Sequence, residues 1–159
     1  MSFRIGIGYD IHRLVVGRKL ILAGVIIDYP RGLLGHSDAD VIAHAVCDAM
    51  LGAVARGDIG ALFPDTTPET KDMNSIDMLK QIVQMIEKEY MIANIDINCI
   101  CERPKLSFYR EKMVAVLAEA CKIDTACISI KFRTNEGLGE VGSGDAIASQ
   151  AVVLLEKAE

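Results

Sequence analysis

Apolar and polar residues follow two different spacings along the chain, and these spacings predict a mixture of strands and helices. Runs with β-type apolar character or strict alternation predict strands over residues 3–9, 94–103 and 126–133, and a hairpin-like pair over 19–27. The other long apolar segments predict helices over residues 75–89, 106–122 and 145–157. Segments rich in glycine, proline and polar residues predict loops over 28–35, 58–74 and 134–144.

A further helix has a clear start signal in the sequence. Ser37 can cap it, and Asp40 follows three residues later, as in a capping box with Asp in place of Glu. Asp38 and Asp40 also suit the positive end of the helix dipole. We expect this helix to run to about Ala55 and to stop near Gly57.

The order of these elements predicts an α+β fold in a single domain covering residues 1–159. Strands and helices alternate with hairpin-like pieces, which favours an α/β sandwich: a mixed sheet covered by helices on one face. The strands remain fairly apolar on the uncovered face, which indicates an oligomer. The polar loop over 58–74 is long for a compact domain, as active-site lids often are.

Composition narrows the classes of function. The chain has 159 residues, 51% hydrophobic and 25% charged, as in an ordinary folded domain. Its net charge of −5 disfavours nucleic-acid binding but leaves room for a local basic pocket. No apolar run approaches the roughly 20 residues of a membrane span, and the start lacks the apolar core of a signal peptide. We therefore expect a cytoplasmic protein that does not contact membranes.

The cysteines predict neither a disulfide framework nor a thiolate zinc site, because they are odd in number and lack CxxC spacing. They are Cys47, Cys99, Cys101, Cys121 and Cys127. Four of them lie among apolar neighbours, so buried and unreactive thiols are expected.

The histidines of the chain all lie in one short segment, as His12, His36 and His44. Asp10 and His12 are two residues apart at the end of a predicted strand, so both point to the same face. With His44 they form a set of three ligands that leaves coordination positions open, as in catalytic zinc sites. The alternative is that Asp-x-His is a common pattern and that a lone helical His packs or faces solvent.

Neighbouring residues can support such a site. Asp40 and Asp48 lie four residues before and after His44, where a carboxylate can orient the other ring nitrogen of a ligating His. Capping explains Asp40 equally well, whereas Asp48 lies too deep in the helix to cap, which favours the orienting role. His36 and Ser37 precede the helix N-terminus, which attracts phosphate, and His36 can donate to a phosphoryl oxygen. A plain cap explains Ser37 equally well.

The loop from Lys131 to Gly144 is rich in glycine, which lets a backbone approach a ligand closely. It lacks the GxxxxGK[ST] pattern of a P-loop. Glu136 in this loop is a candidate magnesium ligand, since magnesium prefers carboxylates together with substrate phosphates. A solvated loop acid explains Glu136 on its own at least as well.

Four motifs follow one another along the chain. They are Gly8-Tyr9-Asp10-Ile11-His12, Leu34-Gly35-His36-Ser37-Asp38-Ala39-Asp40, Gly57-Asp58-Ile59-Gly60 and Leu62-Phe63-Pro64-Asp65-Thr66. In this order and spacing they resemble signatures of the 2-C-methyl-D-erythritol 2,4-cyclodiphosphate synthase family. The resemblance covers nearly the whole chain.

This resemblance implies a phosphorus-oxygen lyase. The family converts 4-diphosphocytidyl-2-C-methyl-D-erythritol 2-phosphate to the 2,4-cyclodiphosphate and releases CMP, in the non-mevalonate route to isopentenyl and dimethylallyl diphosphate. It forms homotrimers whose sheets pack around a central cavity, with an active site at each subunit interface. The reaction is an intramolecular phosphoryl transfer, so the protein must mainly fold back the substrate and neutralise charge.

By position, the resemblance also assigns residues to roles. Asp10, His12 and His44 would bind zinc or manganese, and Glu136 would help hold magnesium or manganese between the phosphates. The residues that stabilise the transition state would be His36 and Thr134. The expected substrate contacts are Ser37, Asp58, Ile59, Gly60, Phe63, Asp65, Cys101, Pro104, Lys105, Leu106 and Arg133.

The glycine-rich loop departs from the family pattern. Gly137 stands in place of a basic residue, Glu140 in place of an aromatic residue and Ser143 in place of an arginine. In the family, that arginine and aromatic residue line the central cavity of the trimer, where an isoprenoid diphosphate can bind. The hypothesis is that the cavity of this protein binds such ligands weakly or not at all. Arg133 replaces a threonine, and either an added cation or a lost hydroxyl contact can follow.

Two other functions compete with the synthase. The same three ligands suit a metal-dependent phosphohydrolase with water as nucleophile, and the reaction product discriminates the two. A trimeric binding protein whose metal only braces the fold is the third interpretation. An Asp with two His ligands accepts zinc, manganese or cobalt, so the sequence leaves the native metal open.

Overall fold

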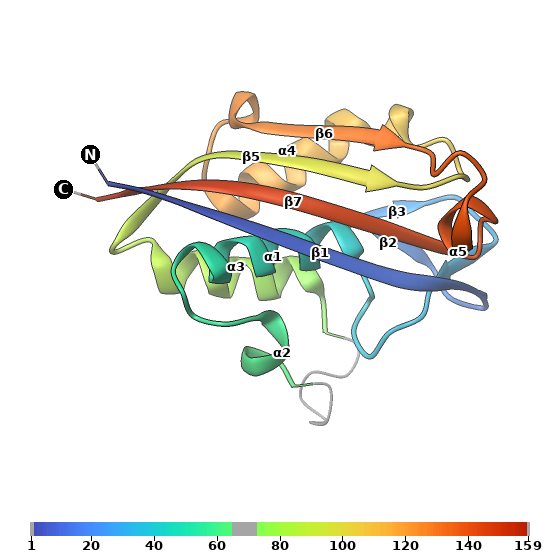
Figure 1. Cartoon of the computed structure of the whole chain (residues 1–159), viewed down its shortest axis with the longest axis horizontal. Coiled ribbons are helices and arrows are strands. Elements are labelled where there is room, and N and C mark those ends of the chain that lie inside the picture. The colour runs from blue at the N-terminus through green and yellow to red at the C-terminus, as the bar shows by residue number, and fades with distance from the viewer. Residues whose placement is uncertain (1, 65–72, 159) are drawn as a thin grey trace.

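The computed structural model describes residues 2–64 and 73–158 as a mixed sheet with helices on one face (Figure 1). The main sheet has the order β4-β1-β7-β5-β6, in which β5 and β6 are parallel and the other neighbours antiparallel. A second, two-stranded sheet pairs β2 with β3. The strands are β1 (Phe3–Val16), β2 (Leu20–Leu22), β3 (Val25–Ile27), β4 (Arg31–Leu33), β5 (Tyr90–Ile100), β6 (Ile128–Arg133) and β7 (Ala146–Lys157). The predicted fold class is confirmed.

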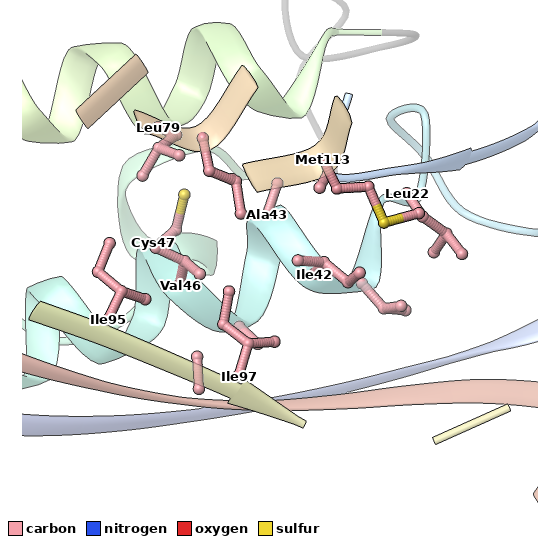
Figure 2. Packing of buried hydrophobic residues seen from close by; sticks show 14 of the residues in the cluster. Leu22, Ile42, Ala43, Val46, Cys47, Leu79, Ile95, Ile97 and Met113 are labelled. Atoms are coloured by element: carbon pink, nitrogen blue, oxygen red, sulfur yellow. The ribbon is translucent and has the colours of Figure 1, made fainter. Parts of the chain in front are cut away.

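Helices α1, α3 and α4 gather on one side of the sheet (Figure 1). Figure 2 shows Ile42 and Val46 of α1 between Ile95 of β5 and the helices that carry Leu79 and Met113. This layer of helices on a sheet forms the main apolar core. Within the described residues, every helix is too short or too polar to span a bilayer. The helical elements are α1 (Val41–Ala53), α2 (Ile59–Leu62), α3 (Ser75–Ile86), α4 (Arg110–Cys121), α5 (Gly139–Gly142) and the 3-10 turns η2 (Ser107–Tyr109) and η3 (Thr125–Cys127).

The prediction of a helix over residues 145–157 is wrong. This segment forms β7, the central strand of the sheet, which pairs with β1 on one side and with β5 on the other. A strand between two others is apolar on much of both faces, so its run of apolar residues lacks clear alternation. Periodicity alone does not separate such a strand from a buried helix.

The capping prediction for α1 is also corrected. The N-cap is Asp40 rather than Ser37, because the Asp40 carboxylate accepts from the backbone N–H groups of Ile42 and Ala43. The same carboxylate accepts from the N–H groups of Ala23 and Gly24 in the β2–β3 turn. Burial raises the pKa of Asp40 to about 6, against the opposing effect of these N–H groups. One buried carboxylate therefore joins the start of α1 to the second sheet.

Four of the five cysteines are buried, and all five are free thiols. Burial raises the pKa values of Cys101 and Cys121 to about 12, so both thiols stay protonated at neutral pH. The prediction of buried cysteines is confirmed for four of the five, and their lack of reactivity stays a prediction.

Two glycines of β1 allow α1 to lie directly on the sheet. A Cβ atom at Gly6 would lie 1.7 Å from the Ala49 carbonyl oxygen, and one at Gly8 would lie 1.9 Å from that of Ala45. Non-bonded carbon and oxygen atoms never approach so closely, so only glycine fits at either position. Asp10 follows Gly6 and Gly8 on the same face of the strand.

The opposite face of β1 is apolar and exposed. Ile5, Ile7 and Tyr9 alternate with the inward-facing residues and are 72%, 63% and 56% exposed. Phe3 and Ile11 extend this row, and Val152 lies beside Ile7 on β7. Contiguous apolar surface of this kind marks an interaction site, which agrees with the oligomer expected from the sequence.

We predict that Gly8→Ala destabilises the protein by about 3 kcal/mol or more, because the new methyl group meets backbone rather than a movable side chain. Gly52→Ala on α1 is the matched control, since its Cβ would have no neighbour closer than 3.9 Å. We expect this control to be neutral or to stabilise by up to about 1 kcal/mol. Urea unfolding at one protein concentration measures both. Equal stability of Gly8→Ala and wild type would contradict the close approach.

Candidate functional site

Three side chains from two elements converge at the start of α1. Asp10 and His12 come from the inward face of β1, and His44 comes from the first turn of α1. The Asp10 Oδ2 atom lies 3.2 Å from His12 Nε2 and 2.8 Å from His44 Nδ1. One potential ligand atom from each residue lies within 4.8 Å of the other two. Two nitrogens and one carboxylate oxygen at this separation suit a divalent cation, so the predicted convergence is confirmed.

Backbone contacts hold the first two ligands in position. Nδ1 of His12 donates to the Leu34 carbonyl oxygen at 2.6 Å, since a carbonyl can only accept. This leaves the Nε2 lone pair of a neutral His12 directed at Asp10. The other oxygen of Asp10, Oδ1, accepts from the Ile11 N–H at 2.8 Å. In both residues, one side-chain atom is hydrogen-bonded to the backbone, which fixes the orientation of the side chain. The other atom, Nε2 of His12 or Oδ2 of Asp10, is available to bind a cation.

The electrostatics of the site follow from this clustering. Burial raises the pKa of Asp10, but hydrogen bonds and charge interactions with His12 and His44 outweigh it and hold that pKa well below its usual range. The hydrogen bond to Asp10 raises the pKa of His12 above its ordinary value, against burial. A carboxylate that stabilises a bound proton on its neighbour can stabilise a metal cation in the same place.

A cleft of about 320 Å³ opens over these three residues. It gathers many of the residues predicted from the sequence, with contributions from β1, the loop before α1, α1 and α2. Asp58 is not one of the lining residues; it precedes Ile59 and caps α2 by accepting from the Ala61 N–H at 2.9 Å. The lining residues are Asp10, His12, His36, Ser37, His44, Asp48, Ile59, Gly60, Phe63 and Met78. Asp65 lies outside the described residues.

The prediction that Asp48 orients His44 is wrong. Asp48 Oδ1 accepts from the Ile59 N–H at 2.7 Å and so ties α2 to α1. In the described structure, Nε2 of His44 instead faces Ser75 Oγ at 2.8 Å and Ser37 Oγ at 3.2 Å. Sequence analysis missed Ser75, because a serine in the first turn of a helix is an ordinary helix-start signal.

The remaining predicted residues gather at a second pocket. Its volume is about 390 Å³, and among the described residues it has no lining residue in common with the first cleft. Glu102 at this pocket accepts from the Asn135 N–H at 2.7 Å, which holds the loop after β6 against the end of β5. The predicted residues here are Cys101, Pro104, Lys105, Leu106, Arg133 and Thr134.

Glu136 lies in the loop next to the second pocket. Its carboxylate accepts from the Thr134 hydroxyl at 2.9 Å, so these two predicted residues are in direct contact. Glu136 has a φ of 51°, a left-handed conformation that is strained for a side-chain-bearing residue and common at functional sites. Within one chain, Thr134 therefore lines a different pocket from His36 and from the group of Asp10, His12 and His44, here called the Asp10 cluster. Glu136 is in contact with Thr134.

Comparison with known proteins shows the family of this chain. The YgbB family model matches residues 3–156. The chain belongs to the YgbB family. Its relatives include proteins named 2-C-methyl-D-erythritol 2,4-cyclodiphosphate synthase from Caldicellulosiruptor bescii, 49% identical over 96% of this chain and 98% of the relative, and from Syntrophotalea carbinolica, 52% identical over 98% and 95%.

Solved structures of YgbB-type proteins share the fold. A Plasmodium falciparum structure, described as IspF in complex with CDP, has a TM-score of 0.88 and 38% identity, covering 99% of this chain and 98% of that one. The bifunctional IspDF of Campylobacter jejuni has a TM-score of 0.95 and 37% identity over 99% of this chain. The present chain spans 43% of that longer protein.

We predict that zinc affinity of the purified protein rises at least about tenfold between pH 6 and pH 8. The raised pKa of His12 means that a proton competes for Nε2 near neutral pH and must leave before a metal binds. Competition with a chromogenic chelator of known pH dependence measures this affinity. A zinc affinity that stays constant over this range would exclude His12 as a ligand.

Proposed function

We propose that this protein converts 4-diphosphocytidyl-2-C-methyl-D-erythritol 2-phosphate to 2-C-methyl-D-erythritol 2,4-cyclodiphosphate and CMP. The observation that carries this function is the convergence of Asp10, His12 and His44 in a chain that matches the YgbB family over nearly its whole length. The protein is thus a phosphorus-oxygen lyase of the non-mevalonate route to isopentenyl and dimethylallyl diphosphate. The comparisons favour this activity over a metal-dependent phosphohydrolase, since the relatives carry the synthase name.

In this proposal, Asp10, His12 and His44 would hold a zinc or manganese ion in the first cleft through Oδ2, Nε2 and Nδ1, respectively. The ion supplies positive charge against the diphosphate of the substrate. His36 lines the same cleft and would donate to a phosphoryl oxygen. The substrate brings its own anionic nucleophile, the 2-phosphate, so the site requires no strong protein base.

The second pocket would bind the cytidine part of the substrate. Its lining includes the cationic residues Lys105, Arg110 and Arg133, which suits a polar, phosphorylated ligand. Thr134, which lines this pocket, and Glu136, which accepts from Thr134, would act on the diphosphate, and Glu136 would help hold a magnesium or manganese ion there. The CDP in the Plasmodium falciparum structure supports a cytidine nucleotide as the ligand class.

One substrate has to reach both pockets, and we propose that it does so across a subunit boundary in a homotrimer. The two pockets are separate within one described chain, and the exposed row from Phe3 to Ile11 offers an apolar interface. Asp58, Ile59 and Gly60 would then contact the ribose, with Ser37 beside the phosphates and Phe63 and Asp65 over the methylerythritol. The single-domain organisation and a cytoplasmic location stay predictions.

We predict that Asp10→Asn and His44→Ala each lower turnover at least about 10³-fold while the variants remain trimeric, because each removes a ligand of the ion that neutralises the diphosphate. Asp77→Asn on α3 is the matched control, because it makes the same carboxylate-to-amide change at an exposed surface position. Mass spectrometry of CMP and cyclic diphosphate, with zinc and magnesium present, measures turnover. Release of inorganic phosphate by the wild type instead would favour the hydrolase, and activity retained in both variants would exclude the metal mechanism.

We also predict that isoprenoid diphosphates bind the trimer cavity weakly or not at all. Glu140 and Asp145 line a surface pocket beside Ile11 and Arg13, and the Ser143 hydroxyl donates to Asp145. Carboxylates at this position repel a diphosphate. Calorimetric titration with an isoprenoid diphosphate tests the wild type against a Glu140→Phe, Ser143→Arg double variant, for which we expect measurable binding. Tight binding by the wild type, or clear cavity density in a co-crystal, would contradict the prediction.

A further inference from the structure

Ser75 is buried, lies outside all of the sequence motifs and makes polar contacts on two sides. It is the first residue of α3 and is 0% exposed. Its backbone N–H donates to Asp38 Oδ2 at 3.0 Å, and its hydroxyl donates to Asp38 Oδ1. On the other side of the same hydroxyl lies His44 Nε2, at 2.8 Å. Ser75 therefore stands between a carboxylate and a residue of the Asp10 cluster.

The direction of these hydrogen bonds follows from counting protons. A serine hydroxyl has one hydrogen, and a carboxylate can only accept, so the hydrogen of Ser75 points to Asp38. The oxygen lone pairs of Ser75 then face His44, whose Nε2 must be the donor. Ser37 Oγ lies farther from Nε2, at 3.2 Å, and accepts from the Ala39 N–H. The shorter contact with Ser75 thus decides which nitrogen of His44 carries a proton.

This proton has a consequence for the other ring nitrogen. If Nε2 of a neutral His44 carries the hydrogen, Nδ1 has a free lone pair, and that lone pair faces Asp10 Oδ2 at 2.8 Å. Two acceptors at this distance repel each other unless a cation lies near both. His12 presents the same situation from the other side, with Nε2 at 3.2 Å from the same oxygen. The hydrogen bonds of His44 and His12 thus leave a lone pair of each ring directed at Asp10 Oδ2, an arrangement that favours a cation between them.

We propose that Ser75, held by Asp38, is a positioning residue that selects Nδ1 of His44 as the metal ligand. This inference rests on the proposed function, since it assumes that the Asp10 cluster holds a divalent ion. Hydrogen-bond partners of ligating histidines fix the tautomer and ring orientation, and their loss typically weakens metal binding 10- to 100-fold. The Asp38–Ser75 pair also joins the loop before α1 to the start of α3. A further hydrogen bond, from the Asp38 N–H to the Met73 carbonyl oxygen at 3.2 Å, supports this connection.

Ser75→Ala tests the proposal, because it removes the hydroxyl without adding bulk. We expect zinc affinity, measured directly by chelator competition, to fall about 10- to 100-fold. Asp38→Asn is a second variant, and we expect it to weaken zinc binding in the same direction because it removes the charge that holds the Ser75 hydrogen. Both measurements use the full-length protein and require no turnover.

Asn74→Ala is the matched control for a purely structural effect. Asn74 caps the same helix by accepting from the Ile76 N–H at 2.8 Å, and its loss should lower the melting temperature. Zinc affinity of this control should stay within about threefold of wild type, well below the expected loss in Ser75→Ala. An equal loss of zinc affinity in Asn74→Ala and Ser75→Ala would show that Ser75 acts only by holding α3 in place, and this result would overturn the proposal.

A second measurement tests the choice of nitrogen itself. Imidazole ¹⁵N NMR of the zinc-loaded protein should show His44 bound through Nδ1 with the proton on Nε2, and His12 with the opposite arrangement. Coordination of His44 through Nε2, or wild-type affinity in both Ser75→Ala and Asp38→Asn, would overturn the role of Ser75. A wild-type protein that binds no zinc, manganese or cobalt would instead overturn the proposed function, so the two failures are distinguishable.

Discussion

The close contact of one helix with one strand is the constraint on which the site depends. Gly6 and Gly8 let the backbone of α1 lie directly on β1, at distances that would place any Cβ inside a carbonyl oxygen. Asp10 lies two residues beyond Gly8 on the same face of β1, and His44 directly precedes Ala45, the residue of α1 that lies against Gly8. If the helix lay farther from the sheet, the 2.8 Å contact between these two side chains would be lost. The close packing of α1 on β1 therefore also sets the distance between Asp10 and His44.

Successive contacts reinforce that geometry outward from the site. The Leu34 carbonyl fixes His12, and Ser75 with Asp38 fixes His44. The buried Asp40 carboxylate, which accepts from four backbone N–H groups, fixes the start of the helix that carries His44. A ligand set held in this way loses little conformational freedom when a cation binds, and this favours a defined coordination geometry over a flexible one.

The sequence predicted the site better than it predicted its surroundings, and the reason is physical. Asp10 and His12 share a face because strand periodicity is strict, so their meeting follows from local geometry alone. The contribution of Ser75 depends on how α3 docks against the loop before α1, which is a long-range packing outcome that no local pattern encodes. Strand β7 was predicted as a helix because its apolar residues do not alternate clearly, and its position between β1 and β5, both distant in sequence, is likewise set by long-range pairing.

The two pockets that hold the predicted site residues are separate within one chain. A diphosphate with a cytidine at one end and a phosphorylated tetrol at the other must be bound at both ends to bend back on itself. One chain offers the metal-site cleft and the Cys101–Leu106 pocket as separate surfaces, together with an uncovered apolar sheet face. In the proposed homotrimer, burying that face against further copies of the chain would remove apolar surface from water and bring neighbours from another subunit to the pockets. In the proposed homotrimer, assembly and catalysis would be coupled, because the hydrophobic contact between subunits would also complete the substrate site.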